Sequence, residues 1–328
     1  MALQRIVRTS RESGERLTDI THAQRPARSG TATGSAEIRV TPGRRFQHIL
    51  GFGGAITEAA AYTLSRLPEN TRHRIISDYY DPRSGHGYTM SRLHIHSCDF
   101  SLENYTYVAD GDRSLRSFDM AREERWVLPA LRRAQFVAGR RLFLLASPWS
   151  PPGWMKTNGD MNGGGSLLPE FRRTWADYVV RYLQSMTTRG APVAALSVQN
   201  EPAAVQVWDS CVYSAREEQE FVRDHLGPAL HNANLPDVKL LIWDHNRDLV
   251  FERARDVLSD EAASNYVWGV AHHWYNSEEF DNLSRVHEAF PDKHLIFTEG
   301  CQEGGVHLGE WHTGERYGRN IIGDLRNW

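Results

Sequence analysis

The chain has 328 residues, of which 40% are hydrophobic and 24% charged, a balance typical of soluble globular proteins. Its formal net charge of −3 includes no basic excess that would hold a nucleic acid. No apolar run approaches the length of a membrane span, and the first thirty residues lack the apolar stretch of a signal peptide. As written, the sequence predicts a soluble cytoplasmic protein, or a secreted one if an upstream signal was lost. Nothing in it indicates an oligomeric state.

The polar composition of the first residues and the spacing of the cysteines indicate how the chain is organised into domains. Residues 1–36 are rich in Arg, Ser and Thr, and we expect them to be partly disordered or to form a peripheral strand. Cys98, Cys211 and Cys301 are not spaced as a zinc or redox motif, so we expect free thiols. The remaining residues, 37–328, are predicted to form one domain.

Beyond the polar segment, short runs rich in Val, Ile, Leu and Phe alternate with longer amphipathic stretches. Strands separated by helices of this length must be parallel, and continuous apolar runs are typical of parallel strands buried on both faces. The predicted helices include residues 58–67, 122–138, 169–190, 215–233 and 248–260. The predicted strands are residues 48–57, 89–97, 140–149, 193–202, 238–246, 267–275 and 294–300.

Polar or aromatic side chains end nearly every predicted strand. A doubly wound sheet usually places its ligand chemistry in one or two loops, whereas a closed barrel brings all strand ends to one mouth. We therefore predict an α/β fold, a TIM (β/α)8-type barrel, although only seven strands are found. The strand-end residues are Asp99, Trp149, Asn200, Glu201, Asp244, Asn246, His273, Tyr275 and Glu299.

Two of these residues are glutamates that a barrel would bring together. Glu201 closes the fourth predicted strand and Glu299 the seventh. Paired carboxyl groups suit glycoside hydrolysis, in which one protonates the departing oxygen and the other attacks the anomeric carbon. Either glutamate alone is as readily explained as a salt-bridged rim residue, but two after apolar runs favour a catalytic pair.

Six sequence blocks carry a resemblance to a known family. They read GFGGAITEAAA (51–61), RLHIHSCDFSLENYTY (92–107), LLASPWSPPGWMKTNG (144–159), SVQNEP (197–202), VAHHWY (270–275) and FTEGC (297–301). In this order they resemble the signature blocks of glycoside hydrolase family 30, over roughly residues 48–328. That family includes glucosylceramidases, related β-glucosidases and β-1,6-glucanases. The resemblance therefore implies a carbohydrate or glycolipid substrate and no cofactor.

The resemblance also implies a role for each glutamate. Glu201 corresponds to the general acid/base and Glu299 to the nucleophile of a retaining β-glycosidase. Retention requires carboxyl groups about 5 to 5.5 Å apart. At that separation we expect ionised Glu299 to raise the pKa of Glu201 and keep it protonated until the ester on Glu299 forms.

Other polar residues receive supporting roles. Asn200 offers an amide to the sugar 2-OH. By resemblance, Asp99 binds hydroxyls of the terminal glucose, and Arg92 supports the nucleophile from beneath. Arg92 has an alternative interpretation as part of a buried structural ion pair.

Aromatic faces and hydrogen-bond donors near the nucleophile complete the predicted substrate contacts. These residues are Trp149, Trp208, Trp274, His273 and Tyr275. An aromatic residue in a barrel is more often part of the core, which weakens the assignments of Trp208 and Trp274. His94 and His96 would share one face of a strand, but no third ligand stands in a suitable place, and we predict no metal site.

By the same resemblance, family members continue with an eighth strand and a C-terminal β-sandwich, and neither is found in this sequence. A barrel short of one strand exposes two sheet edges and apolar surface. We therefore expect a truncated family member that is poorly active or inactive alone and that regains activity when extended through the eighth strand.

Three functions stay open at this point. The first is retaining hydrolysis of β-glucosides, of the glucosylceramidase or β-glucosidase type. The second is endo-β-1,6-glucanase activity, and the loops after Glu201 and Glu299 would decide between the two. The third is non-hydrolytic carbohydrate binding by a truncated barrel, although a binding protein would need neither glutamate.

Overall fold

The protein is described by a computed structural model, which covers residues 5–22 and 39–328. In the smaller of its two compact units, strands Val7–Ser10 (β1) and Glu15–Asp19 (β2) form an antiparallel hairpin. The hairpin lies within the N-terminal segment for which we expect partial disorder or a peripheral strand. The boundary predicted at residue 36 lies outside the described residues.

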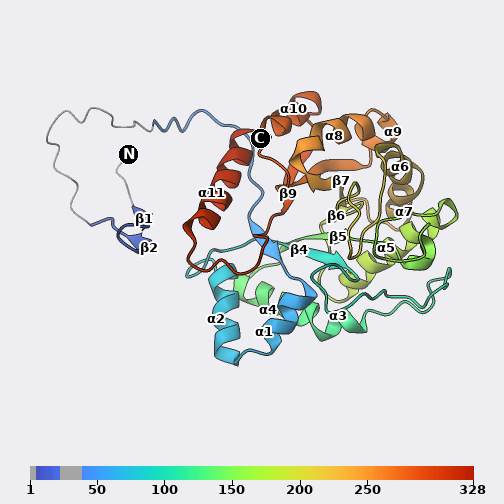
Figure 1. The fold of residues 1–328 in the computed structure, drawn as a ribbon, viewed down its shortest axis with the longest axis horizontal. Coiled ribbons are helices and arrows are strands. Elements are labelled where there is room, and N and C mark those ends of the chain that lie inside the picture. The colour runs from blue at the N-terminus through green and yellow to red at the C-terminus, as the bar shows by residue number, and fades with distance from the viewer. Residues whose placement is uncertain (1–4, 23–38) are drawn as a thin grey trace. The chain divides into compact units, whose positions relative to one another are not determined.

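The larger unit contains a sheet of seven parallel strands, paired in chain order. Each predicted strand is found, and all seven are shorter than predicted. Figure 1 shows β4 to β9 inside a layer of helices. The strands are Gly53–Ala55 (β3), Met90–Ile95 (β4), Phe143–Pro148 (β5), Ala195–Ser197 (β6), Lys239–Asn246 (β7), Val267–His273 (β8) and His294–Glu299 (β9).

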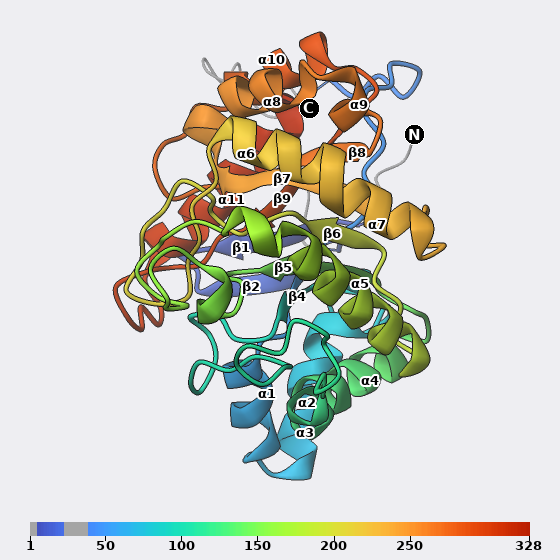
Figure 2. The same ribbon diagram turned by 90° about the vertical axis from the view of Figure 1, so that its right-hand side faces the viewer.

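Helices follow the strands and cover the outer face of the sheet in chain order, as Figure 2 shows from α1 through α5 to α10. The predicted helices are all present, and α2, α9, α10 and α11 lie outside the residue ranges predicted as helices. The helices are Glu58–Ser65 (α1), Glu69–Tyr80 (α2), Ala121–Arg125 (α3), Val127–Ala138 (α4), Arg172–Thr188 (α5), Ala215–Phe221 (α6), Gly227–Asn232 (α7), Val250–Leu258 (α8), Glu261–Ser264 (α9), Asp281–Ala289 (α10) and Trp311–Arg326 (α11).

Local sequence signals fix several helix ends. The hydroxyl of Thr57 caps α1 by accepting from the amide of Ala60. Ser214 and Glu217 form a reciprocal capping box at the start of α6. Gly139 ends α4 in the left-handed conformation, which a residue without a side chain adopts at little cost.

The seven strands curl into a half-barrel, and the predicted TIM-type fold is confirmed for this unit. Within the described residues, β3 and β9 are the edge strands and do not pair with each other. Inside the curl lies a small apolar cluster of Leu145, Ala195 and Leu241 with Ala271. No described helix combines the length and apolar character needed to cross a membrane.

Because side chains alternate along a strand, the residues two positions beyond this cluster face the same interior near the strand ends. Ser147 and His273 are such residues. The barrel interior therefore changes from apolar to polar toward the carboxyl ends of the strands, where the predicted site lies.

Candidate active site

Arg92 of β4 is the buried cation beneath the strand ends. Its guanidinium donates one hydrogen bond to Glu299 and others to Asn200 Oδ1 at 2.8 Å and Asp244 Oδ2 at 2.9 Å. Burial disfavours its charge, but the carboxylates of Asp244 and Glu299 outweigh that cost and raise the pKa of Arg92. The arginine therefore stays charged and fixes the orientation of Glu299.

Glu299, at the end of β9, has a second donor in Tyr275. The Tyr275 hydroxyl donates to Glu299 Oε1 at 2.9 Å and lies 3.2 Å from Cys301 Sγ. Burial, followed by the negative charge of Glu299, raises the pKa of Tyr275, so its hydroxyl stays a donor. A carboxylate held by a cation and a phenol from two sides is suited to act as an oriented nucleophile.

Glu201 follows β6 and adopts a left-handed backbone conformation with φ of 47°. Its Oε1 lies 3.2 Å from Nδ1 of His273, and Nε2 of this imidazole lies 3.0 Å from Asp244 Oδ1. His273 is completely buried. Burial opposes its charge, but the surrounding carboxylates, with Glu299 first, raise the pKa of His273 to about 9. At neutral pH, therefore, Glu201 contacts a buried imidazolium.

The pKa of Glu201 differs from the sequence prediction. Burial favours the neutral acid, but the hydrogen bond and charge of His273 outweigh it and lower the pKa of Glu201. The expectation that Glu299 keeps Glu201 protonated is therefore wrong for this geometry. The sequence places His273 seventy-two residues away and gives no sign of this contact.

The two glutamates themselves are close neighbours. Carboxylate oxygens of Glu201 and Glu299 lie within 4.8 Å of each other and of a ring nitrogen of His273. Both side chains are partly exposed, at 13% and 17%, so solvent reaches them. The barrel thus brings together two carboxyl groups that are far apart in the sequence.

The remaining predicted contacts fall into different surroundings. Trp149 at the end of β5 is buried, with the Arg92 guanidinium 4.7 Å from its ring centroid. Arg92 donates to the amide oxygen of Asn200 and so fixes this side chain. The NH2 group of Asn200 is the donor that the predicted contact with the sugar 2-OH requires. Asp99 stays open to solvent. Its partial enclosure and the negative charges of Glu299 and Glu201 raise the pKa of Asp99 to about 7.

The two weaker aromatic assignments, Trp274 and Trp208, differ in their exposure to solvent. Trp274 is 3% exposed and packs edge-on against Phe297, which places its ring in the core. Trp208 is partly exposed in the loop after Glu201. Sugar contacts by Trp208 and Trp274 stay predictions.

Three residues of the site received no role from the sequence. In the sequence Asp244 of β7 is only a polar strand end, yet it is completely buried and contacts both Arg92 and His273. Ser147 and Thr298 also donate to it, at 2.8 and 2.5 Å. Small hydroxyl residues in apolar runs carry no signal that distinguishes such donors from ordinary core residues.

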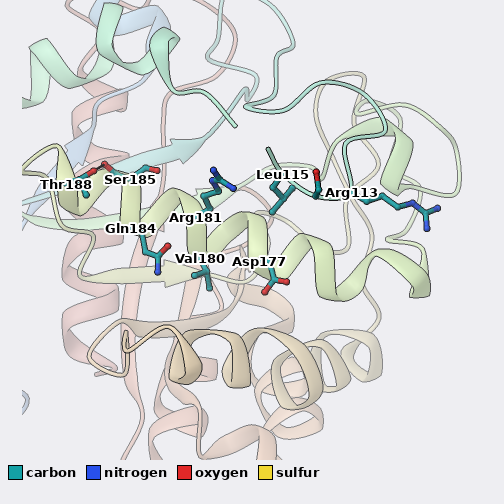
Figure 3. Close-up of a pocket in the computed structure, with 9 residues that line it drawn as sticks. Arg113, Leu115, Asp177, Val180, Arg181, Gln184, Ser185 and Thr188 are labelled. Atoms are coloured by element: carbon teal, nitrogen blue, oxygen red, sulfur yellow. Dashed lines mark hydrogen bonds between the residues drawn. The ribbon is translucent and has the colours of Figure 1, made fainter. Parts of the chain in front are cut away.

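A cavity of about 340 Å³ opens beside Glu299, lined by β3 and β9 residues together with Arg92, Trp149 and Cys301. A larger pocket, of about 520 Å³, lies elsewhere. Figure 3 shows that its lining comes from α5 and from the segment around Arg113, and it includes none of the predicted site residues. The cavity beside Glu299 is therefore the candidate substrate site.

Histidine and acidic residues within reach of a common ion occur twice in the described chain. One group is Glu201, Glu299 and His273, whose ring nitrogens already contact carboxylates. The other comprises His307, Glu310 and His312 in the smaller unit.

The ring nitrogens of His94 and His96 contact protein groups, including the amide of Glu58 and the hydroxyl of Tyr178. These contacts give both residues a structural role.

Comparison with known proteins decides the family. Residues 49–328 match the sequence profile described as the glycosyl hydrolase family 30 TIM-barrel domain. The chain belongs to glycoside hydrolase family 30. Relatives with two different activities in their names are found among its matches.

Mouse lysosomal acid glucosylceramidase is 35% identical over 88% of the chain and 59% of its own length. The endo-1,6-β-D-glucanase of Neurospora crassa is 32% identical over 90% of the chain and 62% of its own length. The crystal structure of SrfJ from Salmonella typhimurium superposes with a TM-score of 0.81 at 39% identity, covering 86% of the chain and 63% of SrfJ. The chain thus spans about three fifths of the length of these relatives.

Proposed function

We propose that this family 30 chain is a retaining hydrolase of β-glucosides. The observation that carries the proposal is the spacing of Glu201 and Glu299, whose carboxylate oxygens lie within 4.8 Å of each other. Inverting enzymes separate the two carboxyl groups by roughly 6.5 to 9.5 Å to admit a water molecule. The shorter spacing supports direct attack by one carboxylate on the sugar and a covalent intermediate.

In the proposed reaction, Glu299 attacks the anomeric carbon while Arg92 and Tyr275 hold it in place. Glu201 protonates the departing oxygen and afterwards takes a proton from the water that cleaves the ester. Since the pKa of Glu201 is lowered, its acid form is the minor form at neutral pH. Activity on substrates that need acid assistance should therefore decline as the pH rises above that lowered pKa.

Glucosides are proposed as the substrate class because relatives named for glucosylceramide and for β-1,6-glucan cover most of the chain at similar identity. We favour the glucosylceramidase or β-glucosidase type, and endo-β-1,6-glucanase activity is the second candidate. Release of glucose from glucosylceramide in detergent would support the first. Shortening of gentio-oligosaccharides at internal bonds would support the second.

The test compares the chain with Glu201→Gln and Glu299→Gln on two aryl β-glucosides with different leaving groups. For 4-nitrophenyl β-glucoside, loss of either glutamate should lower kcat/KM by about a hundredfold or more. For the 2,4-dinitrophenyl glucoside, whose leaving group needs no proton, Glu201→Gln should keep its first-turnover burst while Glu299→Gln loses it. Circular dichroism shows whether each variant is folded.

A folded chain that hydrolyses neither glucoside, alone or extended through the expected eighth strand, would contradict this function. If sugars raise the melting temperature of such a non-hydrolysing chain, the result would instead favour non-hydrolytic carbohydrate binding. Equal loss of the dinitrophenyl burst in both variants would contradict the separate roles of the two glutamates.

A further inference from the structure

Both side-chain oxygens of Asp244 are occupied by donors from other strands. Oδ2 accepts from Arg92 at 2.9 Å and from Ser147 at 2.8 Å. Oδ1 accepts from Thr298 at 2.5 Å and faces His273 Nε2 at 3.0 Å. The donors come from β4, β5, β8 and β9. One buried carboxylate thus links four strands to its own strand, β7.

The main chain of Asp244 contributes a further contact. Its carbonyl accepts from the amide of Glu201 at 2.9 Å. Asp244 is consequently tied to the acid/base in two ways, through this bond and through His273. Its side chain reaches the nucleophile in a third way, because Arg92 is bonded to both Asp244 and Glu299.

An unusual backbone directs Asp244 into the barrel. In a regular strand, residues two apart share a face, so Leu241 in the barrel interior predicts that Trp243, not Asp244, faces inward. Trp243 and Asp244 have left-handed φ angles of 74° and 47°, and the register with β8 shifts at this point. This bulge exchanges the two side chains and turns the carboxylate toward the catalytic glutamates.

Left-handed conformations cost free energy for residues with side chains, and such strain concentrates where function requires it. The outer face of the bulge is held by Glu218, whose Oε1 accepts from the Trp243 amide at 2.9 Å. Arg253 pairs with Glu218 at 2.9 Å and places its guanidinium 4.7 Å from the Trp243 ring centroid. Two helices therefore fix a strained turn whose effect is the inward direction of one carboxylate.

From this geometry, and resting on the proposed function, we infer that Asp244 is a positioning residue shared by both glutamates. Through Oδ2 it fixes Arg92, which holds Glu299. Through Oδ1 it fixes His273 as a cation against Glu201. Removal of this one charge should therefore change the protonation of an imidazole that contacts the acid/base, without any change to either glutamate.

The titration of His273 is the readout, and several charged groups face it. From β7 these are Asp244 and His245, whose ring centroid lies 6.3 Å from that of His273. Asp244 is the only carboxylate that contacts Nε2 in the described chain. The titratable and charged neighbours of His273 in the described chain include Glu201, Asp244, His245, His272, Tyr275, Glu299 and, through Asp244, Arg92.

The experiment measures histidine titration by nuclear magnetic resonance in the full chain labelled at its 15 histidines. His273→Gln identifies the signal by its loss. In the parent, the His273 midpoint should lie near pH 9. In Asp244→Asn, which keeps the shape and removes the charge, the midpoint should fall by at least one pH unit. A midpoint that does not move would overturn the inference.

The control is Asp209→Asn, which neutralises another buried carboxylate, one that accepts from Ser97. It should leave the His273 midpoint unchanged. An equal shift in Asp209→Asn would show that any buried charge has this effect, and would contradict a specific role for Asp244.

A second variant keeps the test decisive if Asp244→Asn fails to fold. Thr298→Val removes the hydroxyl that shares Oδ1 with His273 and leaves the charge of Asp244 intact. Oδ1 then no longer accepts a hydrogen bond from a hydroxyl, and its attraction for the charged imidazole becomes stronger. The His273 midpoint should therefore rise. A fall or an unchanged midpoint would contradict the inference.

The titration does not depend on turnover, which separates this inference from the proposed function. A shift in an inactive chain would support Asp244 as the residue that charges His273 and leave the hydrolase proposal to fail alone. Activity without a shift would contradict the inference and leave the hydrolase proposal standing.

Discussion

At the scale of single residues, the site is a set of compensated buried charges. Arg92 and Asp244 are buried partners, and His273 lies between two carboxylates. A histidine pKa raised by folding contributes stability that is complete below the unfolded value of about 6.5. That contribution is lost as the pH rises through about 9. The contribution of His273 to the stability of the fold should therefore decrease under alkaline conditions.

The His273→Gln variant tests this linkage. Between pH 6.5 and 9 the parent should lose on the order of 3 kcal/mol of unfolding free energy from this group, and the variant should lose correspondingly less. Urea unfolding at several pH values measures the difference, with exposed His73→Gln as the control. Parallel pH curves for His273→Gln and the parent would contradict the assignment of this stability to His273.

At the scale of elements, the local sequence predicts the strands and the helix ends better than it predicts irregularities within a strand. Continuous apolar runs predict the strands well, because parallel strands are buried on both faces. The break between α3 and α4 at Trp126 follows from Pro129, which cannot donate a backbone hydrogen bond in the first turn of α4. The bulge at Trp243 and Asp244 has no such signal, since Trp disfavours the left-handed conformation and a single Asp adopts it only occasionally.

The support of this bulge by α6 makes a prediction about stability. Glu218→Ala removes the acceptor of the Trp243 amide and leaves the buried guanidinium of Arg253 without its carboxylate. It should destabilise the fold by about 3–5 kcal/mol. Glu220→Ala on the same helix breaks only partly exposed ion pairs and should cost about 1 kcal/mol or less. Equal unfolding midpoints for the two variants would contradict this account.

At the scale of the whole chain, the fold and the pairing of the two glutamates follow from the alternation of strands and helices. That alternation predicts which strand ends meet, and it therefore brings Glu201 and Glu299 together. It does not predict the direction in which each side chain turns, or the protonation that results. Those depend on contacts such as His273 with Asp244, which join residues that no local pattern relates.

Covalent trapping tests the central claim most directly, because it requires one turnover and no release of product. The chain is incubated with 2,4-dinitrophenyl 2-deoxy-2-fluoro-β-glucoside, digested and analysed by mass spectrometry. We predict a fluoroglucosyl ester on Glu299, present in Glu201→Gln as well and absent in Glu299→Gln. A folded chain that carries the label on another residue, or releases the phenol without forming any adduct, would contradict a retaining mechanism with Glu299 as the nucleophile.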